Sequence, residues 1–71
     1  MQDISCHLLI SDRSVLEHGK SVSGLAYKDK RFRDGELIHT TAIVSINSNE
    51  HTFVTRSGTV YRWILEPPTD D

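Results

Sequence analysis

Residues 51–64 read HTFVTRSGTVYRWI, which is two short β-prone runs separated by a turn that contains Gly58. The length of that turn sets the pairing register, because a shift of one residue moves every side chain of the second run to the other face. A two-residue turn places Arg62 opposite Phe53. A three-residue turn, with Gly58 in the left-handed conformation of a bulge, places Tyr61 opposite Phe53 instead. The second register buries more aromatic surface, and we therefore predict it.

The preceding run, residues 36–46, is rich in β-branched residues and is the longest strand candidate of the chain. A turn at residues 47–50 would pair it with the first run of the hairpin. In that register Val44 lies opposite Phe53. One face of the predicted three-stranded meander then gathers the apolar side chains of Ala42, Val44, Ile46, Phe53, Tyr61, Trp63 and Leu65.

The opposite face of this meander combines apolar and cationic side chains. It carries Ile43, Val54, Val60 and Ile64 together with Thr41, Thr52, Arg56 and Arg62. Exposed β-branched residues beside arginines indicate either a binding face or the far side of a twisted sheet. If the chain dimerises, we expect the contact on this face or at an edge strand.

The alternation of residues 4–10 predicts a half-buried strand whose inner face carries Ile4, Cys6, Leu8 and Ile10. The next segment has two interpretations. We favour a strand at residues 15–16 followed by a turn at residues 18–19. The alternative is one short helix near residues 12–18 that begins at Asp12.

Several short strands and the absence of a clear helical pattern predict an all-β fold. The expected architecture is a small five-stranded, partly open barrel of the SH3-like kind, or a meander. We expect one domain over residues 1–65. A flexible, acidic, proline-containing tail is expected over residues 66–71.

The chain has 71 residues and a net charge of −2. A domain this short buries only about 60% of the surface that its unfolded chain exposes, so we expect support from self-association or from a larger partner. Cys6 is the only cysteine, which excludes an internal disulfide and a zinc site of the CxxC kind. The net charge argues against a simple nucleic-acid binder, but without the three acids of the tail the body is near +1.

Known targeting, catalytic and cofactor-binding signatures are not recognisable in the sequence. The pattern shows no signal peptide and no apolar membrane span, so we expect a cytoplasmic protein with a reduced thiol and no membrane partner. The sequence has no G-x-S-x-G elbow and no G-x-x-x-x-G-K-[ST] loop. Cys6 belongs to the predicted inner face, and the four histidines fall on separate turns and strands. We therefore predict no catalytic residue, no metal and no cofactor.

Half of the Lys and Arg residues lie in residues 28–35, which read KDKRFRDG. A basic loop with an interleaved aromatic suits single-stranded nucleic acid, because cations meet phosphates while a base stacks. A protein with an acidic surface suits the same residues, since Arg and aromatic side chains dominate interface hot spots. The third interpretation is a solvated loop whose Phe32 packs into the core and whose charges pair locally. The candidate partner-binding residues are Lys28, Lys30, Arg31, Phe32, Arg33, Arg56 and Arg62.

Two motifs resemble a pattern of short uncharacterised bacterial proteins, some of them carried by phages and other mobile elements. The motifs are Arg31-Phe32-x-Asp34-Gly35, preceded by Gly24, and Thr55-Arg56-Ser57-Gly58-Thr59-x-Tyr61. The similarity spans residues 16–65 and consists of turn glycines and strand residues. It implies a shared barrel and no particular chemistry.

Together these observations predict a non-enzymatic binding module, an adaptor or inhibitor encoded by a mobile element that occupies a surface of a host protein or nucleoprotein complex. One alternative is a single-stranded nucleic-acid-binding module that uses the basic loop. Another is a structural subunit of a homo-oligomer, such as a homodimer.

Overall fold

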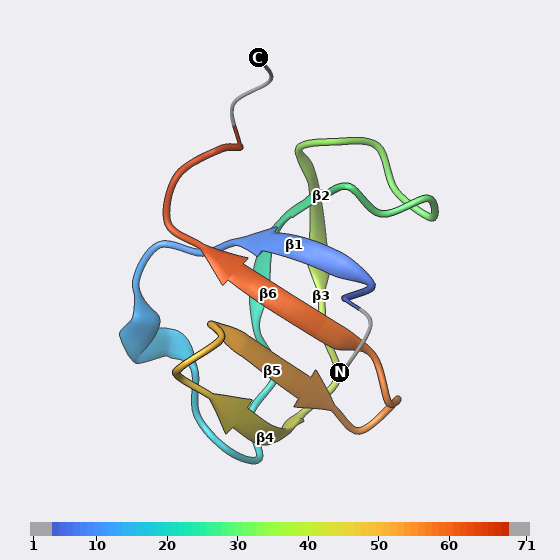
Figure 1. Cartoon of the computed structure of the whole chain (residues 1–71). Helices are drawn as coiled ribbons and strands as arrows, with labels where there is room; N and C mark the ends of the chain where they lie inside the picture. Colours follow the sequence, from blue (N-terminus) through green and yellow to red (C-terminus); the bar gives the residue numbers. More distant parts are fainter. Residues whose placement is uncertain (1–3, 69–71) are drawn as a thin grey trace.

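A computed structural model describes residues 4–68 and places them in one mixed β-sheet with strand order β3-β2-β1-β6-β5-β4 (Figure 1). The all-β prediction is confirmed. The sheet has six strands instead of five, and it is open, so the predicted five-stranded SH3-like barrel is not confirmed. The strands are β1 (Cys6–Leu9), β2 (Ser23–Tyr27), β3 (Glu36–His39), β4 (Ile43–Asn47), β5 (Thr52–Thr55) and β6 (Val60–Ile64).

Two antiparallel meanders make up this sheet. The N-terminal meander contains β1, β2 and β3, the C-terminal meander contains β4, β5 and β6, and β1 and β6 join them as parallel neighbours. The two edge strands, β3 and β4, are consecutive in the chain, and only residues 40–42 link them. In a flat sheet the edges would lie roughly 24 Å apart, whereas this link reaches about 14 Å. The sheet therefore curls strongly and encloses the core.

The core lies on the inner face of the curled sheet. Phe53 stacks on Tyr61 with 5.2 Å between the ring centroids, and its ring lies 6.4 Å from that of Trp63. Both meanders and the linkers contribute buried apolar residues, namely Cys6, Leu8, Ile10, Leu16, Val22, Ala26, Ile38, Ile43, Phe53, Tyr61 and Trp63.

The predicted register of the β5–β6 hairpin is confirmed, because Tyr61 lies opposite Phe53. Gly58 adopts a φ of 85°, and its amide donates to the carbonyl of Thr55 at 2.8 Å. A positive φ costs glycine little because it has no Cβ. The sequence of this turn therefore determines the register of the strand that follows it.

The prediction of one strand over residues 36–46 is wrong. The chain leaves the sheet after His39 and enters it again at Ile43, at the other edge. Thr40 stabilises the break, since its hydroxyl accepts a hydrogen bond from the amide of Val22 at 3.0 Å. A continuous strand would have kept both halves at one edge of the sheet.

The predicted β4–β5 register is also wrong, because Ile46 instead of Val44 lies opposite Phe53, and a bulge between Ile43 and Ser45 then shifts the register once more. Val44 consequently points outward and is 51% exposed, while Ile43 is buried. The turn ends one residue later than predicted, at His51, which has a φ of 56°. Of the other predicted core residues, Ala42 and Ile46 are only partly buried and Leu65 is exposed.

The first predicted strand is confirmed as β1, with Cys6, Leu8 and Ile10 buried. The favoured strand at residues 15–16 is wrong. The segment forms a single 3-10 turn over Arg13–Val15, and Asp12 caps it by accepting a hydrogen bond from the Ser14 amide at 3.1 Å. No helix among residues 4–68 is long and apolar enough to cross a membrane. Residues 69–71 of the predicted tail lie outside the described residues.

Candidate partner-binding surface

The basic loop between β2 and β3 is held by its own carboxylates and backbone. Asp34 accepts a hydrogen bond from the Lys28 amide at 3.0 Å, and the Gly35 amide donates to the carbonyl of Ala26 at 2.7 Å. Lys28 and Gly35 both have positive φ, at 58° and 87°. The acid side chains thus close the loop on itself instead of facing a partner.

Asp29 and Arg31 form the strongest polar contact in the loop. The Asp29 carboxylate, 8% exposed, accepts hydrogen bonds from the Arg31 amide at 2.9 Å and from Nη2 of the guanidinium at 2.7 Å. These bonds lower the pKa of Asp29 despite its burial, and the same side-chain contact raises the pKa of Arg31. Charge-assisted, forked pairs of this kind fix geometry as well as charge. Arg31 therefore holds the loop, and its side chain is still 53% exposed.

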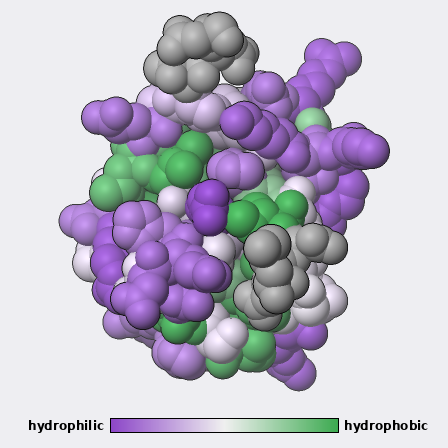
Figure 2. All heavy atoms as spheres, viewed as in Figure 1, coloured by the Kyte–Doolittle hydropathy of each residue, from purple (hydrophilic) through white to green (hydrophobic). Residues whose placement is uncertain are grey.

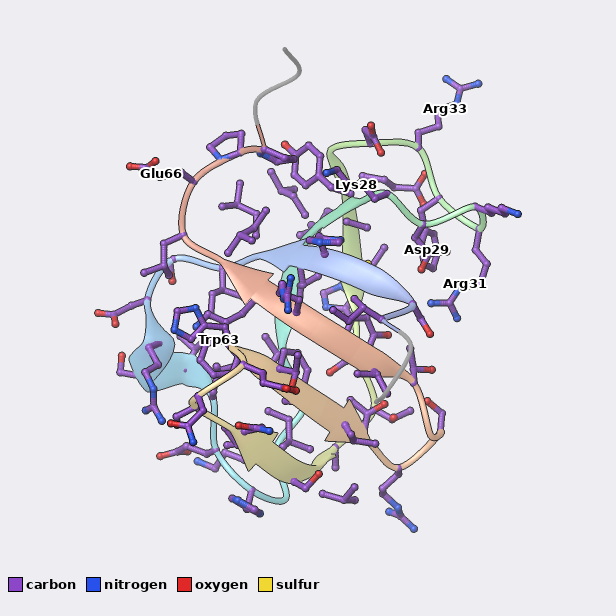
Figure 3. The ribbon with its side chains drawn as sticks, viewed as in Figure 1. Lys28, Asp29, Arg31, Arg33, Trp63 and Glu66 are labelled. Atoms are coloured by element: carbon purple, nitrogen blue, oxygen red, sulfur yellow. The ribbon has the colours of Figure 1, made fainter. Side chains whose placement is uncertain are left out.

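Phe32 is partly buried and packs against the core, with the Arg31 guanidinium 5.0 Å above its ring. The interpretation with local pairing and an inward Phe32 therefore describes these two residues. Lys28, Lys30 and Arg33 are exposed, and no ion pair in the described part of the chain involves them. Figure 3 shows Arg33 pointing away from the body of the protein.

Cys6 is buried on the inner face, as the sequence predicts, and its thiol lies near Asp29 and Arg31 of this loop. Burial raises the pKa of its thiol to about 11. A protonated, buried thiol is a poor nucleophile near neutral pH. Within residues 4–68, no group of three or more His, Cys, Asp or Glu side chains gathers where it could hold a metal ion.

Arg56 and Arg62, predicted to flank Val54 and Val60 on one outer face, lie at opposite ends of the β5–β6 hairpin. Arg62 lies opposite Thr52 at the start of β5, whereas Arg56 lies in the turn after β5 ends. Arg56 is exposed, and its amide donates to the carbonyl of Ala42 at 2.9 Å. Only Arg62 belongs to the central strands.

A row of aliphatic side chains crosses the outer face of four strands in exact cross-strand register. Leu25 pairs with Leu37 on one side and Leu9 on the other, and Leu9 pairs with Ile64. We call Leu37, Leu25, Leu9 and Ile64 the aliphatic row. Leu37, at its open end, is 62% exposed. Sequence reasoning missed this row, because it depends on the parallel β1–β6 contact, which no local pattern encodes.

A second row lies beside the aliphatic row and carries positive charge. His7 pairs across the strands with Tyr27 and with Arg62. Burial, followed by the positive charges of Lys28 and Arg62, lowers the pKa of His7. His7 Nδ1 and Arg62 Nε are buried, and neither has a hydrogen-bond partner within the described part of the chain. We call Tyr27, His7 and Arg62 the polar row.

Figure 2 shows apolar residues gathered where β1 and β6 end, at the upper left of the view, with hydrophilic residues around them. A hollow of about 480 Å³ lies past the Ile64 end of the aliphatic row, lined by His51, Trp63, Ile64, Leu65 and Glu66. The His51 ring stacks on Trp63 at 5.3 Å and forms one wall. Apolar surface thus continues from the row into this hollow.

Comparison with protein-family models, curated proteins and solved structures finds no match to this chain. The resemblance to short bacterial and phage-carried proteins therefore stays a prediction. The function is inferred from the surface itself.

Proposed function

We propose that the chain is a non-enzymatic binding module whose protein partner covers the aliphatic row. The observation that carries this proposal is the row itself, four aliphatic side chains in register on the outer face, with Leu37 at 62% exposure. Antiparallel sheets usually present polar side chains on the face away from the core. A contiguous apolar outer row bordered by charged residues is typical of a protein interface.

The role that fits such a module is that of an adaptor or inhibitor, which acts by occupying a surface of a larger protein or nucleoprotein complex. The small core supports this role, because a domain of this length gains stability from association. The resemblance to proteins of mobile elements suggests a host complex as the target.

The test compares two exposed apolar residues on different strands. Leu37→Asp places a charge at the open end of the aliphatic row, and Val44→Asp places the same charge on β4, at the opposite edge of the sheet. Both variants and the wild-type chain are used to capture partners from a host lysate, with mass spectrometry as the readout. We expect Leu37→Asp to lose a partner that Val44→Asp retains. Equal capture by all three would contradict the proposal.

The alternative function, binding of single-stranded nucleic acid, is favoured by the exposed cations Lys28, Lys30 and Arg33. It lacks a stacking platform in the loop, because Phe32 packs against the core under the Arg31 guanidinium. Fluorescence anisotropy with single-stranded DNA at two salt concentrations distinguishes the two functions. Binding that weakens steeply with salt would favour the alternative.

A further inference from the structure

The two edges of the sheet differ in how they are protected. The edge of β4 is covered, because the Gly19 amide donates to the Ile43 carbonyl at 2.8 Å and the Ile43 amide donates to the Lys20 carbonyl at 3.0 Å. The bulge after Ile43 interrupts the same edge. Covering segments and bulges are the usual means by which proteins prevent an edge from pairing with another chain.

The edge of β3 has neither protection. The Thr40 amide donates to the Val22 carbonyl, and Ile38, opposite Gly24, is the next residue of β3 whose backbone faces β2. The backbone groups of Leu37 and His39 therefore point away from the sheet. Within residues 4–68, no backbone hydrogen bond satisfies these groups. They form a short, free template for an additional strand.

We propose that β3 receives an extended acidic segment of a partner protein as an additional strand. The partner's backbone would pair with Leu37 and His39, and its apolar side chains would extend the aliphatic row past Leu37. This inference rests on the proposed function and names the chemistry of the partner at the same surface.

Charge identifies the occupant as acidic. The loop that leads into β3 contains two carboxylates, and both are engaged, Asp29 by Arg31 and Asp34 by the Lys28 amide. The cations Lys28, Lys30 and Arg33 remain exposed, and Arg33 lies just before β3 begins. Asp34 and the exposed Glu36 at the start of β3 offset part of this charge, and residues 28–36 keep a net charge of +1. An incoming strand would pass the three exposed cations, which acidic side chains would neutralise.

A second copy of the chain fits the same edge less well. Antiparallel pairing of two β3 strands would place residues 39–42 of one copy beside the basic loop of the other, and that segment carries no acid. The acidic C-terminal segment contains Pro67 and Pro68, which have no amide proton to donate to a ladder. The β3 strand of a second copy could pair with the edge but would not neutralise the loop. The C-terminal segment carries acids but could not form a continuous ladder with the edge.

The test begins with selection of random short peptides displayed on phage against the immobilised full chain. We expect enrichment of peptides that alternate apolar residues and carry Asp or Glu. Amide hydrogen exchange is then measured by NMR on the wild-type chain with and without a synthetic copy of an enriched peptide. Slower exchange at Leu37 and His39, with no change at Val44, is the expected result.

Leu37→Pro tests the backbone contact when it is compared with Leu37→Ala, because both variants lose the leucine side chain and only proline loses the amide. Proline is tolerated at an edge position whose amide faces solvent, but it removes the donor that the incoming strand requires. We expect the peptide to bind at least about tenfold more weakly to Leu37→Pro and to Arg33→Glu. Arg56→Glu, an exposed Arg in the turn after β5, is the matched control and is expected to bind normally. Circular dichroism checks the fold of each variant.

The outcomes separate this inference from the proposed function. If a selected peptide is lost in Leu37→Asp while exchange at Leu37 and His39 is unchanged, the face binds a partner but β3 receives no strand. Peptides insensitive to Leu37→Asp would overturn both statements. Enrichment of peptides without acids would exclude the acidic segment. Self-association lost in Leu37→Pro would identify a second copy as the occupant, and salt-sensitive protection of the same amides by single-stranded DNA would identify nucleic acid.

Discussion

The two meanders of the sheet have the same connectivity but differ in the side chains that they contribute to the core and in the protection of their edge strands. The C-terminal meander brings the aromatic stack to the core, with Phe53 between Tyr61 and Trp63, and the edge of its β4 strand is covered. The N-terminal meander has no aromatic side chain on its inner face, where β2 presents only Gly24 and Ala26, and it carries a long basic loop and the open edge of β3. A Cβ added to Gly24 would clash with the carbonyl oxygen of Leu9, so β1 and β2 pack closely only because residue 24 is a glycine.

This difference suggests that one meander stabilises the fold while the other presents the binding surface. Large aromatic side chains bury more apolar area than small ones and dominate the energy of a small core. An unpaired edge and uncompensated charges contribute nothing to folding. Because the unpaired edge and the uncompensated charges occur only on the N-terminal meander, we infer that this meander binds the partner.

The largest expected effect tests this division directly. Phe53→Ala removes a fully buried ring and should lower the free energy of unfolding by about 3–5 kcal/mol. Ile38→Ala, on the inner face of β3, should cost about 2 kcal/mol, because an edge strand can move to fill the cavity. Urea unfolding followed by circular dichroism measures both. A loss in Ile38→Ala as large as that in Phe53→Ala would show that the meanders share the core equally.

The same two regions show how much of the fold could be predicted from the sequence. The β5–β6 register was predictable because Gly58 encodes the geometry of its turn locally. The β4–β5 register was not, since the bulge at Val44 and the left-handed His51 carry no glycine or proline signal. The break at Thr40 was hidden in a continuous β-branched run, because it is imposed by the need to reach the opposite edge.

The candidate site divides in a similar way. The basic loop was visible in the sequence, and the proximity of Asp29 to Arg31 was a local signal of their pairing. The aliphatic row was not visible, because Leu9 meets Ile64 only through pairing of strands from opposite ends of the chain. Contacts between residues close in the sequence could therefore be predicted. The aliphatic row, which combines both meanders, could not be predicted without knowing the order of the strands in the sheet.

The Asp29–Arg31 contact gives a prediction of intermediate size, within the N-terminal meander. Asp29→Asn should lower the free energy of unfolding by about 1 kcal/mol, which is below the usual range for a charged hydrogen bond because the Arg31 side chain is 53% exposed and partly screened. Arg31→Lys keeps the charge but loses the forked geometry. A double-mutant cycle with both substitutions, measured by urea unfolding, isolates their coupling.

The pH dependence supplies the control for this prediction. The pKa of Asp29 is lower in the folded state than its ordinary value of 3.8, so its contribution is present above that value and is lost as the pH falls through the folded pKa. The free energy of unfolding of Asp29→Asn should therefore decrease less between neutral and acidic pH than that of the wild-type chain. If the free energy of unfolding of Asp29→Asn falls in acid as steeply as that of the wild-type chain, the charge of the carboxylate contributes nothing to stability.

The smallest expected effect concerns His7, where the two meanders meet on the outer face. Its pKa is lowered by burial and by the charges of Lys28 and Arg62, so the unfolded chain takes up the proton more readily than the folded chain. Stability should be full above the ordinary pKa of 6.5 and should decrease as the pH falls below it. His7→Gln should weaken this decrease in urea unfolding, with His18→Gln, at an exposed position, as the matched control.

Binding of an acidic segment should respond to the same proton with the opposite sign. A protonated His7 adds a third positive charge beside Lys28 and Arg62, which favours an acidic partner even while it disfavours folding. The affinity of a selected acidic peptide should therefore rise as the pH falls below about 6.5 in the wild-type chain, and it should rise less in His7→Gln. If the affinity falls in parallel with stability, the polar row supports the fold and takes no part in recognition.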